Sequence, residues 1–386
     1  MVPLPSMHHT EVPLAAGYVD GGLGSDTNPV ARAEEYTYLG VKISEDRTFT
    51  RHLEDTVTPA INKAAAAVWR VTEATGGLPA GAASAVMRAL GESQLTYCAG
   101  VWAPVEGAGS CAQNWGTTRA AEDKAKVAYN KVARVAVGGV PVHTPLAAVY
   151  LELGLPEPGG VWAREVLRLW RKVALLPRGR LPREAWEHAR SQGTANAFVA
   201  RARAAHRMLL GRELPASGPA VGLAARDAEK KAADAALRKL AKERWEAHVR
   251  DKEAEGAGFY SGAPVPGTPG GFRAHVPPRG CDHTGRRMLV AHRLHGHYLQ
   301  ACVGGLRGMW RPMEQRACPR CALEWGGQGP APVEDEAHYW AECPSLRPAR
   351  ERMLSELDGA YPGFRQRWAP LSRLDRARAL AGVWCP

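Results

Sequence analysis

The 386-residue sequence predicts a mainly α-helical fold, and three observations support this prediction. Apolar residues recur at helical spacing over most of the chain, and Gly- and Pro-containing pairs interrupt the pattern. The stretch near Tyr38–Ile43 alternates apolar and polar residues, as one short half-buried strand does. Closely spaced Cys and His residues near the C-terminus predict a small, separately held lobe. We therefore expect a helical bundle with a short strand, a basic helical middle region and a compact C-terminal lobe.

The first 160 residues divide into an arm and a helical region. Residues 1–32 are rich in Pro, Gly and polar residues without a sustained period, so we expect a flexible arm. After the strand, Thr58 is expected to cap a helix that has Pro59 at its first position and ends at Gly76-Gly77. A second helix is expected over Ala80–Ala99 because its apolar residues share one face.

Residues 161–255 are expected to be helical and basic. Trp162 and Trp170 belong to an apolar stripe, while Arg164 and Arg168 face elsewhere. These two arginines have two readings: they neutralise nucleic-acid phosphates, or they form the solvated face of an ordinary amphipathic helix. A long helix over Ala224–Val249 follows, and its alternating charges favour a solvated face. Residues 256–280 are Gly- and Pro-rich and are expected to be a linker.

The region 281–386 contains the pattern C-x2-C-x16-H-x4-C, formed by Cys318, Cys321, His338 and Cys343. Three sulfurs and one imidazole nitrogen make a closed tetrahedral site of the kind that Zn²⁺ prefers. The pattern therefore predicts a structural zinc ion rather than a catalytic one. The alternative is a chance grouping in a chain with 8 Cys and 13 His. The gap between the two ligand pairs is Gly- and Pro-rich, so we expect a loop there.

Basic and aromatic residues precede and enter this pattern. The expected nucleic-acid contacts are Arg286, Arg287, Arg293, His297, Tyr298 and Arg311. Arginine suits phosphate contacts, and Tyr298 suits stacking on an unpaired base. Cys281, His283, His292 and His295 gather in the same region. A second zinc site is conceivable there, but the spacing fits no standard finger, and helix packing with phosphate contacts explains these residues better.

The net charge of +11 and the pI near 9.4 predict a polyanionic partner. RNA or DNA is the expected partner, with a membrane surface or an acidic protein as alternatives. A GC-rich coding sequence would also raise the arginine content without any binding role. The N-terminus lacks the pattern of a secretory signal, and no run of eighteen apolar residues occurs. We therefore expect no membrane association, and a reducing compartment, the nucleus or cytoplasm.

Several short motifs occur in an order that resembles one protein family. These are Tyr38-Leu39-Gly40-Val41, Phe49, His52, Gly76-Gly77, Tyr97-x2-Gly100-Val101-Trp102, Gly138-Gly139, Thr144-Pro145, Leu151–Pro156, Arg293-x2-Gly296-His297 and the Cys-Cys-His-Cys pattern. In this order they resemble the thumb-to-zinc-knuckle region of non-LTR (LINE-type) retrotransposon reverse transcriptases. The resemblance brackets residues 36–350. It implies a thumb-like helical region at residues 33–160 and a zinc-knuckle domain at residues 281–386.

The departures from this family limit the expected activity. Such polymerases hold their metal ions with two adjacent Asp residues, and no two Asp are adjacent in this sequence. The sequence begins after the point where that motif would stand, so we expect no catalytic residues and no enzyme activity. We expect a non-catalytic, nucleic-acid-binding C-terminal portion of a reverse transcriptase. The alternative is an interaction subunit, or a host-retained zinc-binding protein, that completes a polymerase whose palm lies on another chain.

Overall fold

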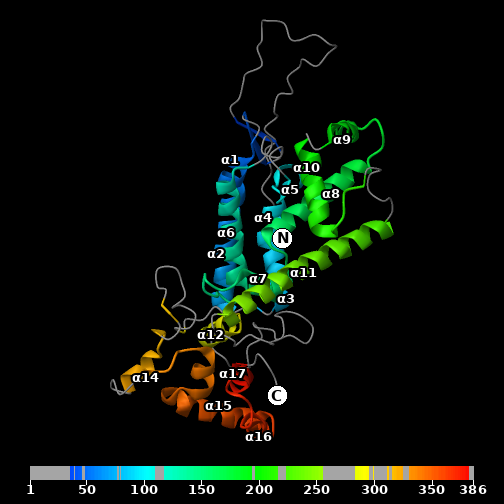
Figure 1. Ribbon diagram of the computed structural model, residues 1–386. Helices are drawn as coiled ribbons and strands as arrows, with labels where there is room; N and C mark the ends of the chain where they lie inside the picture. Colours follow the sequence, from blue (N-terminus) through cyan, green and yellow to red (C-terminus); the bar gives the residue numbers. More distant parts are fainter. Residues whose placement is uncertain are drawn as a thin grey trace, which may run out of the picture.

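The computed structural model confirms the mainly α-helical fold class and divides into a long helical body and a smaller C-terminal lobe (Figure 1). It describes residues 35–38, 40–45, 48–75, 78, 80–108, 117–193, 196–215, 223–254, 283–294, 299, 311–312, 315–324 and 330–381. The expected arm, residues 1–32, and the expected linker, residues 256–280, lie outside these ranges. In the described part of the chain, no helix combines the length and apolar character that a membrane crossing requires.

The stretch expected to form one strand is a β-hairpin. Strand β1 (Glu35–Tyr38) pairs antiparallel with β2 (Val41–Ser44), and Tyr36 lies opposite Ile43. Gly40, in the connection, has a φ of 79°, a left-handed conformation that glycine adopts without steric cost. The expectation of one strand over Tyr38–Ile43 was therefore wrong. Alternation alone did not reveal that this glycine reverses the chain.

The first long helix begins earlier than expected. Helix α1 (Thr50–His52), the π turn η1 (Leu53–Val57) and α2 (Thr58–Thr75) follow one another without interruption. Thr58 is therefore an interior residue and not the N-cap, which corrects the expected start. Its N–H donates to Leu53 O, five residues back. Pro59 lacks an N–H, and it follows directly on this π turn, where the backbone hydrogen-bond register changes.

The second expected helix is interrupted. It consists of α3 (Ala80–Val86), the π turn η2 (Met87–Glu92), α4 (Ser93–Thr96) and, after a break, α5 (Ala99–Trp102). Cys98 sits at the break with a φ of 52°. The break turns α5 so that Trp102 and Gly100 face the neighbouring helices.

Six further helices complete the body. They are α6 (Arg119–Ala136), α7 (Leu146–Leu153), α8 (Pro158–Ala174), α9 (Leu181–Gln192), α10 (Ala197–Leu210) and α11 (Leu223–Ala254). Helix α2 packs along α6, α10 packs against α8, and α11 crosses α7 and α10. One hydrophobic core runs from the hairpin through α11, so the segments 33–160 and 161–255 share it, and it continues through Val290 and Leu294 to four alanines of the C-terminal lobe, Ala337, Ala341, Ala377 and Ala381. The boundary at residue 160 falls inside α8.

Aromatic rings fill the centre of this core. Trp102 is fully buried, and it meets His52 and Trp162 edge to face, with ring centroids 5.7 Å and 5.9 Å away. Its Nε1 donates to Tyr97 O at 2.9 Å. A Cβ atom at Gly100 would lie 2.6 Å from Leu169 Cβ, so only glycine lets α5 approach α8 this closely. This contact explains the spacing of Gly100 and Trp102.

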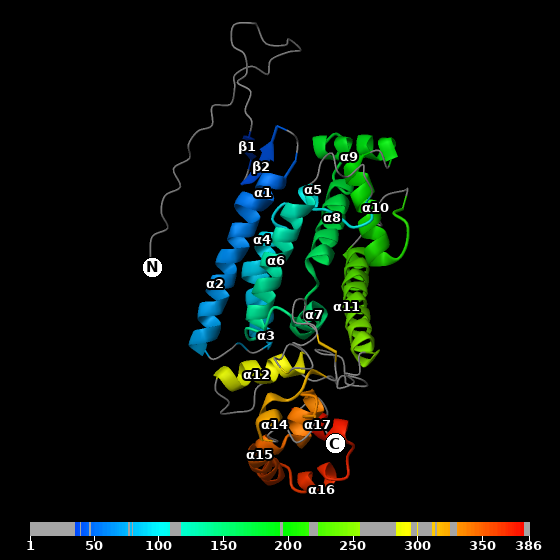
Figure 2. The ribbon, with the colours of Figure 1, turned by 60° about the vertical axis from the view of Figure 1, so that its left-hand side comes forward.

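The C-terminal lobe lies beyond α12 (His283–Arg293), at one end of the body (Figure 2). Its elements are α14 (Pro319–Glu324), η7 (His338–Glu342), η8 (Pro344–Leu346), α15 (Arg347–Ala360), α16 (Phe364–Trp368) and α17 (Arg373–Ala381). Leu354, Phe364, Trp368, Ala379 and Leu380 form its own small apolar core. A separate cluster contains the three cysteines Cys318, Cys321 and Cys343.

Candidate metal centre

The four ligand-type residues expected to meet do so inside the lobe. Cys318, Cys321, His338 and Cys343 are all buried, and their candidate ligand atoms lie within 4.8 Å of one another. Cys321 Sγ is 3.3 Å from His338 Nε2 and 3.8 Å from Cys343 Sγ. A tetrahedron with metal–sulfur bonds of about 2.3 Å and metal–nitrogen bonds of about 2.0 Å has edges of about 3.5–3.8 Å. This group of side chains could therefore hold one metal ion.

The first ligand pair is placed by a short antiparallel bridge and a helix start. Ala317 pairs with Val333, and Cys318 N donates to Pro332 O at 2.7 Å. Pro319 then opens α14, a position where its missing N–H leaves no bond unmade. Helix α14 carries Cys321 back toward Cys318. The bridge thus fixes the turn that presents both sulfurs.

The second ligand pair depends on a π turn. His338 and Cys343 are five positions apart, and in an α-helix their side chains would point about 140° apart. In η7 the backbone is wider, and Cys343 N donates to His338 O at 2.6 Å. Both side chains can then face the same centre. The spacing predicted a helical turn, but it is the wider π form of the turn that lets His338 and Cys343 face one metal ion.

Helix α17 braces this turn from outside. Arg373 donates to both carboxylate oxygens of Asp335, at 2.9 Å and 3.1 Å, and its Nε donates to Glu342 at 2.8 Å. Asp335 in turn accepts from His338 N at 2.6 Å. One guanidinium therefore fixes the residues on both sides of the π turn. No feature of the local sequence connects Arg373 with the ligands.

Burial sets the protonation states of the ligands when no ion is bound. It raises the pKa of Cys318, and together with the neighbouring thiols of Cys343 and Cys318 it raises the pKa of Cys321 to about 12. Burial lowers the pKa of His338. The imidazole is thus kept in the neutral form that binds metals. The thiols need a nearby cation to ionise, which a bound metal ion would supply.

The metal centre joins the body through α12. His292 is buried, and its ring stacks on Tyr339 and meets Trp340 edge to face, with centroids 5.2 Å and 5.3 Å away. Both aromatic residues follow the ligand His338 directly. Arg293 Nε donates to Ala381 O at 2.9 Å, which fastens α12 to the end of α17. These contacts give His292 a packing role, while Cys281, His295, His297 and Tyr298 lie outside the described residues.

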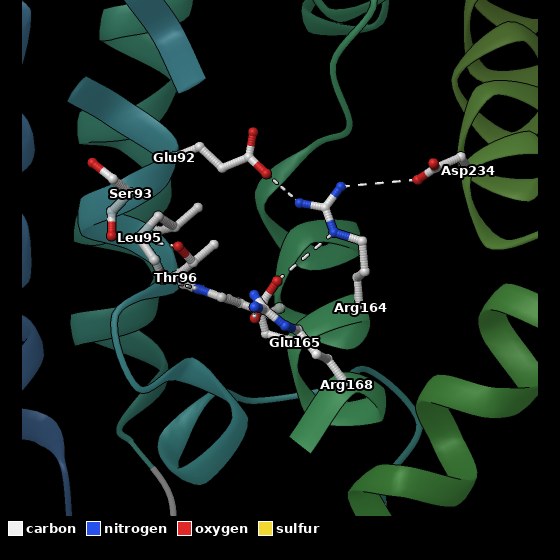
Figure 3. A network of polar contacts seen from close by, with 9 residues as sticks. Glu92, Ser93, Leu95, Thr96, Arg164, Glu165, Arg168 and Asp234 are labelled. Atoms are coloured by element: carbon white, nitrogen blue, oxygen red, sulfur yellow. Dashed lines mark hydrogen bonds and ion pairs between the residues drawn. The ribbon is translucent and has the colours of Figure 1, made fainter. Parts of the chain in front are cut away.

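Two of the arginines expected to contact nucleic acid are engaged within the protein. Arg164 forms ion pairs with Glu92, Glu165 and Asp234, which come from three different elements (Figure 3). Its side chain is only 25% exposed. Arg293 holds Ala381, and burial lowers its pKa. Both side chains therefore have a structural role in this fold.

The other expected contacts are placed differently. Arg168 is 78% exposed, and in the described part of the chain its one carboxylate partner is Glu165, at 3.3 Å. Arg311 is exposed. Arg286 and Arg287 belong to α12, but their side chains are outside the described part of the structure. Arg168 and Arg311 are thus the expected contacts whose described side chains are open to solvent.

Reasoning from single motifs overlooked a second group of cations. Lys172 lies in the last turn of α8, and Arg178 and Arg180 lie in the connection after it. Lys230 and Lys231 lie in the first part of α11. All five are exposed, and none has a carboxylate partner among the described residues. An ion pair between Arg171 and Glu229 brings these two segments to the same end of the body. We call these five residues the basic end. A count of charge by segment would have revealed it.

Comparison with known proteins adds no relative: no family model matches the chain, and neither curated proteins nor solved structures give a match.

Proposed function

We propose that this chain is a non-catalytic, nucleic-acid-binding portion of a protein related to non-LTR reverse transcriptases. In this proposal the basic end makes the main phosphate contacts, and a structural Zn²⁺ holds the C-terminal lobe. The order of the sequence motifs supports the family, while the charge distribution supports the binding role. The closed Cys₃His set supports zinc, because thiolate and imidazole ligands suit this ion and no carboxylate or water position is needed.

The observation that carries the binding role is the uneven distribution of charge. Residues 161–254 contain 21 Lys and Arg against 11 Asp and Glu, whereas the rest of the chain contains 29 against 28. Almost all of the net charge of +11 therefore belongs to α8–α11 and their connections. A GC-rich coding sequence would spread extra arginine over the whole chain. Concentration in one segment instead favours a surface for a polyanion.

The cations of residues 161–254 fall into two groups, which we assign different roles. Arg164, Arg171 and Arg244 pair with carboxylates of other elements and hold the helices together. The five residues of the basic end are exposed and have no such partners among the residues that the structure describes. Figures 1 and 2 draw α9 and α10 at the end of the body away from the lobe. A nucleic-acid strand lying there would contact the basic end without touching the metal centre.

A salt titration tests the proposal. We expect the protein to bind single-stranded RNA or DNA with an affinity that falls steeply with salt, because counterions leave the phosphates on binding. Replacing Lys172, Arg178, Arg180 and Lys231 with Ala should flatten the slope of log affinity against log salt by about three to four units, about one per lost contact. The slope is measured by fluorescence anisotropy.

A matched variant controls for the loss of four charges. Lys63, Arg70, Arg88 and Lys131 are exposed residues of the body outside residues 161–254, and none has a carboxylate partner among the described residues. Replacing these four with Ala should leave the slope within about one unit of the wild-type value. Equal slopes for the two variants would refute the basic end as the binding surface. A wild-type protein that fails to bind either nucleic acid would refute the proposed function itself.

A further inference from the structure

The π turn η7 and the residues that flank it face the metal centre on one side and the body on the other. His338 begins the turn, Cys343 follows its end, and both belong to the candidate metal site. Ala337 and Ala341 are buried in the core that continues from the body. Trp340 packs against both that core and the lobe's own small core. One short turn therefore supplies metal ligands and also contacts to the body.

Helix α12 receives these contacts and lies between the lobe and the body (Figures 1 and 2). On the lobe side, the buried ring of His292 stacks on Tyr339, with ring centroids 5.2 Å apart. On the body side, the buried Val290 has its Cγ2 4.0 Å from the position of a Cβ atom at Gly138, in the connection after α6. Leu294 is fully enclosed in the same core. The contacts of η7 thus continue through α12 to the body.

A metal ion would act directly on the shape of η7. Single π turns are rare, because their backbone hydrogen bonds span five residues instead of four. In an ordinary α-helical turn, the side chains of His338 and Cys343 would point about 140° apart and could not share one ion. An ion bound by both therefore selects the π form. It also fixes the directions of Tyr339 and Trp340, because these residues lie between the two ligands in the chain.

We propose that metal binding controls the docking of the C-terminal lobe on the helical body, with η7 and α12 as the coupling elements. With the ion bound, Tyr339 is held against His292 and α12 stays packed between the two regions. Without the ion, η7 leaves the π form and α12 loses its contacts on the lobe side. Helix α12 has 11 residues, and helices this short are marginal without tertiary contacts. This coupling depends on the proposed Zn²⁺ but not on nucleic-acid binding.

Hydrogen exchange of the full-length protein, followed by mass spectrometry, tests the coupling. Zn²⁺ is removed with a chelator and then added back, and the metal content is measured at each step. We expect the amides of residues 290–294 to exchange about tenfold faster or more without the ion, and to regain their protection when Zn²⁺ returns. Peptides from α8 and α10 should exchange at the same rate throughout, because these helices are held by the core of the body.

His292→Ala separates metal binding from docking. His292 is not one of the candidate ligands, so the variant should keep its Zn²⁺. Residues 290–294 should then exchange rapidly both with and without the ion. The matched control is His188→Ala, because His188 is an exposed histidine of α9. Figures 1 and 2 draw α9 at the end of the body away from the lobe, so this variant should respond to the metal as the wild type does.

Two results would overturn the coupling alone. Unchanged exchange of α12 after complete removal of Zn²⁺ would show that Arg373 and apolar packing hold the turn without the ion. A full metal response in His292→Ala would show that the ring stack does not link the two regions. A protein that takes up no Zn²⁺ would refute the coupling together with the metal assignment. The salt titration of nucleic-acid binding does not depend on any of these results, so the binding role stands or falls separately.

Discussion

The helical body, from β1 to α11, and the C-terminal lobe, from residue 311 to α17, are held together by different kinds of contact. The body buries large side chains in one continuous core, with Trp102, Trp162 and Trp245 almost fully enclosed. The lobe has a core of five residues and a separate cluster of three cysteines, and four of its alanines, Ala337, Ala341, Ala377 and Ala381, join the core of the body. A core this small contributes little free energy, and small units ordinarily need a metal or disulfides. We therefore expect metal binding, more than this small apolar core, to decide whether the lobe folds.

The two regions also differ in charge. The basic segment of the body carries a net charge of +10 over residues 161–254, while residues 311–386 contain 11 Arg and 10 Asp or Glu. Within the described lobe, Arg365, Arg373 and Arg378 pair with carboxylates of the lobe. Long-range attraction of a polyanion thus belongs to the body.

Losing the metal ligands should produce the largest effect and should separate the two regions. In Cys318→Ser/Cys343→Ser we expect no bound zinc and an unfolded lobe, because a structural zinc site contributes about 10 kcal/mol or more to local folding at neutral pH. Elemental analysis measures the loss of zinc, and intrinsic Trp fluorescence, to which Trp340 and Trp368 of the lobe contribute among the 12 Trp of the chain, follows the unfolding. Far-ultraviolet circular dichroism should show that the helices of the body are retained.

Cys98→Ser is the control for this double variant, because Cys98 is exposed and lies in the body. It should keep its zinc and its fluorescence. Full zinc retention in the double variant would contradict the assignment of the ligands. Unfolding of the body together with the lobe would contradict the view that the body folds without the metal site.

Replacing a tightly packed glycine of the body with alanine should lower the free energy of unfolding, whereas the same replacement at an open position of the lobe should not. In Gly100→Ala the new Cβ would lie 2.6 Å from Leu169 Cβ and 3.0 Å from Glu165 O. We expect the free energy of unfolding of the body to fall by about 1–3 kcal/mol, measured by urea denaturation. Gly359→Ala in α15 meets nothing within 4 Å and should be neutral or stabilising by about 0.5–1 kcal/mol. Equal effects would mean that the α5–α8 contact is not tightly packed.

The smallest expected effect concerns the brace on the metal site. In Arg373→Gln the charged bonds to Asp335 and Glu342 are lost, and the π turn that carries His338 is less restrained. We expect zinc affinity to fall about tenfold, the lower end of the range for outer partners of a metal site, measured by competition with a chelator. Arg367→Gln, whose guanidinium pairs with no described carboxylate, should leave the affinity unchanged. An unchanged affinity in Arg373→Gln would show that the turn holds its shape without α17.

The sequence anticipated features that depend on neighbouring residues. The spacing of two Cys, and of one His and one Cys, indicated which side chains meet, because each pair lies within a single turn. It also indicated most helices, but not that Tyr38–Ile43 is a hairpin or that Thr58 lies inside a helix. The first error concerned a chain reversal, which depends on the left-handed backbone of Gly40. The second concerned the start of a helix, because the π turn before Thr58 continues the helix of α1 into α2. The identity of the ion as zinc stays a prediction.

What the sequence by itself determined is the mainly helical class, the four ligand-type residues and the location of the surplus positive charge. The tertiary structure alone decided which cations are available to a partner. Arg164 and Arg293 looked as suitable for phosphate as any other arginine, yet their partners Glu92 and Ala381 lie 72 and 88 positions away in the chain. The physical reason is that a side chain's chemistry is local, whereas its neutralisation depends on residues that only folding brings beside it.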